Sequence, residues 1–86
     1  MVKKYTFAEM RKKNEAAGHY WFQGMSRTYR EAYNIISQRT YYDGHDNYIC
    51  VKYKSGRRNW YYFNPDNGHI VPIHSEKVPE KIREKA

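Results

Sequence analysis

Apolar and polar residues alternate along the second half of the chain, which predicts an antiparallel β-meander. The clearest stretch is Tyr48–Phe63, YICVKYKSGRRNWYYF. Its alternation runs up to Ser55-Gly56 and then resumes, as expected for a β-hairpin. Asn, Asp, Gly and Pro cluster at the other junctions, and these residues favour turns. The predicted strands are 34–42, 48–54, 59–63 and 69–73, and the predicted turns are 43–44, 55–56 and 64–68.

The position of the hairpin turn decides which side chains share a face of the sheet. With Ser55-Gly56 as a two-residue loop, Val51 lies opposite Trp60 and Cys50 lies opposite Tyr61. A slip of one residue would exchange the two faces, because side chains alternate along a strand. We expect the first face to be the core and the second, more mixed face to be a contact surface. The first face carries Ile49, Val51, Tyr53, Trp60, Tyr62 and Ile70, and the second carries Tyr48, Cys50, Lys52, Asn59, Tyr61, Phe63, His69 and Val71.

Helical signals precede the strands. Thr6-Phe-Ala-Glu9 is a capping box that opens a helix from about Phe7 to Ala17, and Gly18 is suited to end it in a left-handed conformation. The apolar segment His19–Phe22 is predicted to pack under this helix, and a second helix follows over 27–32. The predicted fold class is α+β, with one long and one short N-terminal helix packed on a three- to four-stranded antiparallel β-meander.

The 86 residues are enough for one small domain. We expect residues 1–73 to form this domain and the polar residues 74–86 to form a weakly ordered C-terminal tail. Large aromatic side chains should fill the core, since they bury the most apolar area. The side chains expected to be buried are Trp21, Phe22, Trp60 and Tyr62.

The balance of charge favours an anionic partner. Lys and Arg outnumber Asp and Glu by 16 to 9, which gives a formal net charge of +7. Within the predicted hairpin, residues 52–58 hold four cations and no acid. Ten tyrosines add side chains that are common at protein interfaces. The predicted partner-binding residues are Lys52, Lys54, Arg57, Arg58, Tyr48 and Tyr61 on the hairpin, with Arg11 and Lys12 on the first helix.

The sequence shows no arrangement typical of catalysis or of cofactor binding. Cys50, the single cysteine, lies within a strand and has no base at a local spacing. The potential metal ligands His45, Cys50, His69 and His74 lack the close pairing of zinc sites. No acid pair indicates hydrolysis, and no glycine-rich loop could hold a phosphate. We therefore expect a protein that is not an enzyme and that has no metal, cofactor or small-molecule substrate.

No signal peptide or membrane-spanning stretch is visible, so a cytoplasmic location in a host cell and no membrane partner are expected. Residues 5–73 contain the motif Asn14-x-x-x-Gly18-His19-x-Trp21-Phe22 before a small meander. In this the chain resembles a group of uncharacterised small proteins encoded by phages and prophages. Its size and charge also resemble phage counter-defence proteins, including anti-CRISPR inhibitors.

The counter-defence resemblance implies stoichiometric inhibition of a host defence protein, with a CRISPR effector nuclease as the leading partner. It assigns no specific residues. The alternative is a small phage regulator that binds DNA or RNA through the basic hairpin 48–63. That interpretation depends on charge, because phosphate contacts dominate nucleic-acid affinity.

Overall fold

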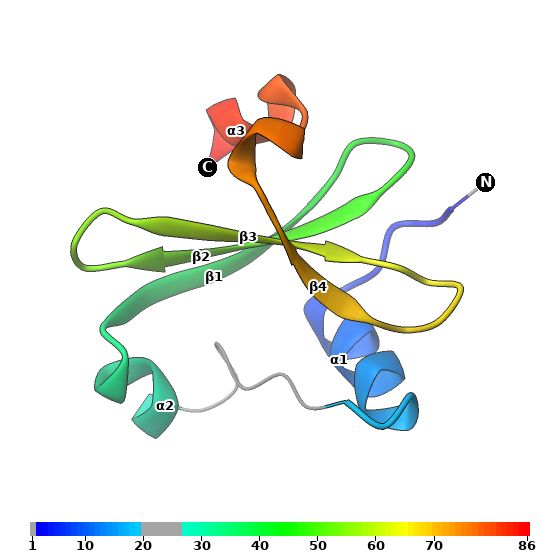
Figure 1. Ribbon diagram of the computed structural model, residues 1–86, viewed down its shortest axis with the longest axis horizontal. Coiled ribbons are helices and arrows are strands. Elements are labelled where there is room, and N and C mark those ends of the chain that lie inside the picture. Colours follow the sequence, from blue (N-terminus) through cyan, green and yellow to red (C-terminus); the bar gives the residue numbers. More distant parts are fainter. Residues whose placement is uncertain (1, 20–26) are drawn as a thin grey trace.

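The computed structural model describes residues 2–19 and 27–86 and shows an α+β fold (Figure 1). Within these residues, four antiparallel strands form one sheet in the order β1-β2-β3-β4. Helices α1 and α2 lie on one side of the sheet, and α3 lies on the other (Figure 1). The elements are α1 Phe7–Ala16, α2 Arg27–Ala32, β1 Ile35–Tyr42, β2 Asn47–Tyr53, β3 Arg58–Phe63, β4 Ile70–Ile73, a 3-10 turn Ser75–Lys77 and α3 Glu80–Lys85.

The predicted meander is confirmed, and so is the capping box that starts α1. The Glu9 N–H donates to the Thr6 hydroxyl at 3.2 Å, and the Thr6 N–H donates to the Glu9 carboxylate at 3.0 Å. The second of these bonds, together with the ammonium group of Lys3, lowers the pKa of Glu9. At the other end of the helix Gly18 adopts a φ of +86°, which glycine accepts at little cost.

The predicted hairpin register is wrong by one residue. The Tyr53 N–H donates to the Arg57 carbonyl at 2.9 Å, and the Gly56 N–H donates to the Tyr53 carbonyl at 3.0 Å. The loop therefore has three residues, Lys54-Ser55-Gly56, with Gly56 at a φ of +90°. Such loops are a common alternative to the two-residue turn. As a result Cys50, not Val51, lies opposite Trp60.

This shift changes which face of the sheet each β3 side chain joins. Trp60 is buried as expected, but it lies with Tyr48 and Cys50 and away from Ile49 and Val51. Tyr62 is only half-buried, and the expected burial of Trp21 and Phe22 concerns residues outside the described part of the chain. The α1-side cluster contains Met10, Ile35, Ile49, Val51 and Phe63, and the α3-side cluster contains Tyr48, Cys50, Trp60, Val78 and Ile82.

The segment expected to be a weakly ordered tail covers the second face of the sheet. Val78 and Ile82 are each 2% exposed and pack in the α3-side cluster. Val78 lies in the extended link between the 3-10 turn and α3, and Ile82 lies in the first turn of α3. The Arg83 side chain also donates to the Val78 carbonyl at 3.1 Å. With so few apolar residues the segment shows little periodicity, although these two positions are enough to dock it.

Two buried asparagines fasten N-terminal segments to the sheet. Asn14 on α1 accepts a hydrogen bond from the Ile70 N–H at 3.1 Å. Asn47 on β2 accepts from the Tyr5 N–H at 2.9 Å and donates to the Lys3 carbonyl at 2.9 Å. The Asn47 amide is satisfied as both acceptor and donor, and the Asn14 carbonyl oxygen is satisfied by Ile70, so these hydrogen bonds offset part of the cost of burying the two side chains.

Truncation of Ile82 tests the packing of α3. We expect Ile82→Ala to lower the free energy of unfolding by about 2–4 kcal/mol, because it leaves a cavity in the α3-side cluster. The neighbouring exposed position provides a control, and Lys81→Ala should change it by less than about 0.5 kcal/mol. Urea unfolding followed by circular dichroism measures both. Equal stability of the two variants would show that α3 does not contribute to the core.

Candidate binding site

The four hairpin cations gather at one end of the sheet, around the β2–β3 loop. Lys54, Arg57 and Arg58 are exposed, and Lys52 is half-buried. The ion pairs in the described part of the chain join Lys3 to Glu9 and Arg11 to Glu15. Within that part the hairpin cations therefore have no carboxylate partner.

The structure divides these cations between the two sides of the sheet. Lys52 and Arg58 are directly opposite each other in the β2–β3 ladder. Arg39 of β1 lies opposite Cys50, and so it projects from the same face as these two. Lys54 and Arg57 instead line a cavity beside Tyr53, which packs against the α1-side cluster. Arg39 was missed in the sequence because only the observed strand pairing places it beside the hairpin.

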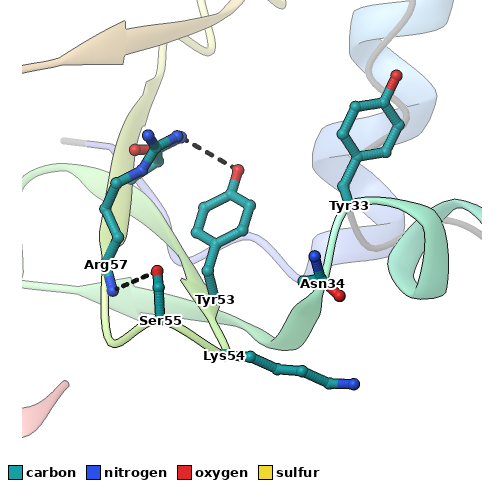
Figure 2. A pocket seen from close by; sticks show the side chains of 7 residues that line it. Tyr33, Asn34, Tyr53, Lys54, Ser55 and Arg57 are labelled. Carbon is teal, nitrogen blue, oxygen red and sulfur yellow. Dashed lines mark hydrogen bonds between the residues drawn. The ribbon is translucent and has the colours of Figure 1, made fainter.

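The cavity beside Tyr53 has a volume of about 540 Å³, and aromatic, amide and cationic side chains line it. Tyr33 and Tyr53 stand on either side of it, with Asn34 between them (Figure 2). The Arg57 guanidinium lies over the Tyr53 ring, 5.1 Å from its centroid. The Asn59 amide donates to the Tyr53 hydroxyl at 3.1 Å, which holds the end of the ring in place.

The junction between α2 and β1 forms one side of this cavity and is hydrogen-bonded to the hairpin loop. Asn34 has a φ of +57°, a conformation that asparagine tolerates better than most residues. Its carbonyl accepts a hydrogen bond from the Lys54 N–H at 2.9 Å. The backbone before β1 is thus attached to the loop that carries the cations.

Two large apolar side chains are exposed beside the cations. Tyr33, in the turn before β1, is 58% exposed, and Ile36, at the start of β1, is 56% exposed. Ile36 lines a second cavity, of about 230 Å³, together with Arg39 and Lys52. We call the combined surface the hairpin end. It consists of Tyr33, Ile36, Arg39, Lys52, Lys54, Arg57 and Arg58.

The two hairpin tyrosines predicted to bind a partner do not belong to the hairpin end. Tyr48 is 6% exposed in the α3-side cluster, whereas Tyr61 is half-buried and packs against the α1-side cluster. They lie on opposite faces of the sheet, so the structure does not bring them into one surface. Both side chains stabilise the fold through their apolar contacts.

The predicted residues of α1 also lie apart from the hairpin. The helix is at the other end of the sheet from the β2–β3 loop (Figure 1). Arg11 contacts Glu15 at 3.9 Å, and Lys12 is exposed on the same helix. These two cations form a separate surface.

The possible metal ligands are not assembled in the part of the chain that the structure describes. Residues 2–19 and 27–86 contain no group of three or more His, Cys, Asp or Glu side chains suited to a metal ion. His69 lies beside His19, with their ring centroids 4.1 Å apart. Sequence reasoning missed this contact, because the two residues are distant along the chain.

The environment of Cys50 is unfavourable for a thiolate nucleophile. Burial raises the pKa of the Cys50 thiol, while the nearby charges of Arg58 and Lys52 act in the opposite direction. The net effect favours the protonated form.

In the described residues, no helix has the length and apolar character needed to cross a membrane.

Comparisons with known proteins do not assign a family or a function to this surface. No family model matches the chain, and no curated protein or solved structure shows significant similarity to it.

The burial of Tyr48 should make stability sensitive to alkaline pH. Burial raises the pKa of Tyr48 from 10.0 to about 12, and the charges of Asp43 and Asp46 act in the same direction. The contribution of the neutral hydroxyl is therefore complete below pH 10 and is lost as the pH rises towards 12. We expect Tyr48→Phe to lose less stability than the wild type over this range. Urea unfolding at several pH values measures the difference, and identical profiles would contradict it.

Proposed function

We propose that this protein is a non-enzymatic binding protein that holds the acidic surface of a protein partner with its hairpin end. The observation that supports this most directly is the combination of exposed apolar and cationic side chains there. Tyr33 and Ile36 provide apolar contact area, and the surrounding cations have no carboxylate partner in the described chain. Tyr and Arg are also the residue types that dominate interface hot spots.

The cations of the hairpin end contribute little to folding. Lys52 and Arg58 lie opposite each other in the β2–β3 ladder and repel one another, so the free protein gains no stability from that pair. Carboxylates of an acidic partner would attract these cations and so would replace the repulsion between them with a favourable interaction. Arg57 and Arg58 could each bind a carboxylate with two hydrogen bonds, while covering Ile36, which is 56% exposed, would add about 1 kcal/mol.

The proposed biological role is stoichiometric inhibition of a host defence protein, with a CRISPR effector nuclease as the leading candidate. This role requires a surface that occupies a site on the partner, and it requires no chemistry. It is motivated by the resemblance of the motif Asn14-x-x-x-Gly18-His19-x-Trp21-Phe22 to phage-encoded proteins and by the small, basic chain.

Direct binding of nucleic acid is the second candidate, and the cavity beside Tyr53 supports it. A base could stack on Tyr33 while a phosphate contacts Lys54 or Arg57, as in single-strand binders. Both faces of the sheet carry buried aromatic residues beneath helices, so stacking would be limited to this cavity. Such binding must weaken steeply with salt.

Reversing two charges at the hairpin tests the proposed surface. We expect Arg57→Glu/Arg58→Glu to keep the wild-type circular dichroism spectrum and to lose at least about tenfold in partner affinity, since each lost charged hydrogen bond costs about 1.5–3 kcal/mol. The readouts are capture of a partner from host lysate with mass spectrometry and survival of a phage or plasmid under CRISPR interference. The matched control is Lys77→Glu/Lys81→Glu, which changes the net charge equally on an exposed surface away from the hairpin.

The same variants separate the two candidate functions. With a protein partner, reversing one acidic patch on the partner should partly restore binding of Arg57→Glu/Arg58→Glu. With nucleic acid, gel shifts should show a shallower salt slope for the variant. A folded and fully active double variant would exclude the hairpin end and would direct attention to Arg11 and Lys12 on α1.

A further inference from the structure

The α3-side face of the hairpin end contains a like-charge pair within the sheet. Lys52 and Arg58 are directly opposite in the β2–β3 ladder, where side chains of equal charge destabilise a sheet. Arg39 projects from the same face of the adjacent strand, one row away. Three cations from three strands therefore share one region.

Electrostatic effects on two neighbouring groups agree with the placement that the strand pairing gives these cations. Arg58 and Lys52 both act on the Cys50 thiol, and Arg39 and Arg58 both act on the Tyr41 hydroxyl. Cys50 and Tyr41 line the cavity of about 230 Å³ that Arg39 and Lys52 also line. Arg58 lies at the edge of this region, opposite Lys52, and also lines a neighbouring cavity between β3 and β4.

Helix α3 covers the neighbouring row of the sheet, and Ala86 at its end lines one side of the cavity, while Lys52 is half-buried and Arg58 is exposed. Val78, which precedes the helix, and Ile82 of the helix pack with Tyr48, Cys50 and Trp60. The next row, which holds Lys52 and Arg58, is not part of that cluster. The exposed side chain of Ile36 forms an apolar wall beside it.

We propose that Arg39, Lys52 and Arg58 form a carboxylate-binding site for an acidic segment of a protein partner. This inference rests on the proposed function and states what the partner must present to the α3-side face. Two guanidinium groups and one ammonium group can bind two or more carboxylates, and Arg does so with paired hydrogen bonds. The exposed aliphatic side chain of Ile36 suits a peptide that carries an apolar side chain among its acids.

If the site exists, one substitution should raise the stability of the free protein and weaken its binding to an acidic peptide. Arg58→Gln removes the like-charge pair without adding an acid. We expect the melting temperature of the free protein to rise by about 1–5 °C at low salt, as relief of such a pair should give in a domain of this length. In 1 M NaCl the difference should vanish, because the screening length falls to about 3 Å.

Binding is measured with the probe peptide Ac-EELEEE-NH2, titrated into ¹⁵N-labelled full-length protein at low salt. We expect amide shifts at Arg39, Cys50, Lys52 and Arg58, and affinity at least about fivefold weaker for both Arg58→Gln and Lys52→Gln. Lys4→Gln removes the same charge from an exposed position in the N-terminal segment and should change neither the melting temperature nor peptide affinity. A single-stranded oligonucleotide of 20 nucleotides is titrated in parallel.

Several outcomes would overturn the site. Unchanged melting temperature and unchanged peptide affinity in Arg58→Gln would show that the three cations do not act together. Shifts of these residues by the oligonucleotide and not by the peptide would assign the surface to nucleic acid. If a captured partner binds Arg39→Gln/Lys52→Gln as tightly as wild type but loses Arg57→Glu/Arg58→Glu, the carboxylate site fails while the proposed function stands. If the peptide binds as expected but the Arg57→Glu/Arg58→Glu variant inhibits fully, the proposed function fails instead.

Discussion

The pairing of β2 with β3 is the interaction on which the rest of the structure depends. Residues 47–51 of β2 are buried without interruption, because the strand contributes side chains to both faces of the sheet. Ile49 and Val51 face α1, whereas Tyr48 and Cys50 face α3. The position of Trp60 opposite Cys50 then completes the second cluster. A sheet buried on both faces requires a covering layer on each, and the short helices on its two sides provide them.

The sequence contained most of the information about the strands but not about their register. Turn residues and alternation placed the strands within one or two residues, since these are local signals. The loop between Tyr53 and Arg57 is one residue longer than the smallest hairpin loop, and nothing in Lys54-Ser55-Gly56 distinguishes the two lengths. That single residue exchanged the faces of β3. The covering role of α3 was equally hidden, because Val78 and Ile82 are isolated among polar residues.

The candidate site was only partly predictable for the same reason. The hairpin cations are adjacent in sequence, so their clustering required no knowledge of the fold. Arg39 joins them only through the β1–β2 ladder, and Ile36 only through the exposed start of β1. Conversely, Tyr48 is of a residue type that is common at interfaces, but it lies buried beneath α3. Sequence identifies charged segments well, whereas the surface they form depends on the register and on which helix covers each face.

The hydrogen bond between Asn14 and Ile70 has a consequence for the order of folding. Each strand pairs with its neighbour in the chain, so the sheet can grow by closing short loops. Docking α1 joins residues 56 positions apart and therefore pays a larger loop-closure entropy. Nascent hairpins would thus form first and α1 would add last. For the same reason, α1 is the element that should detach when the native state opens partially. Met10 and its neighbours would then be exposed while the four strands stay paired.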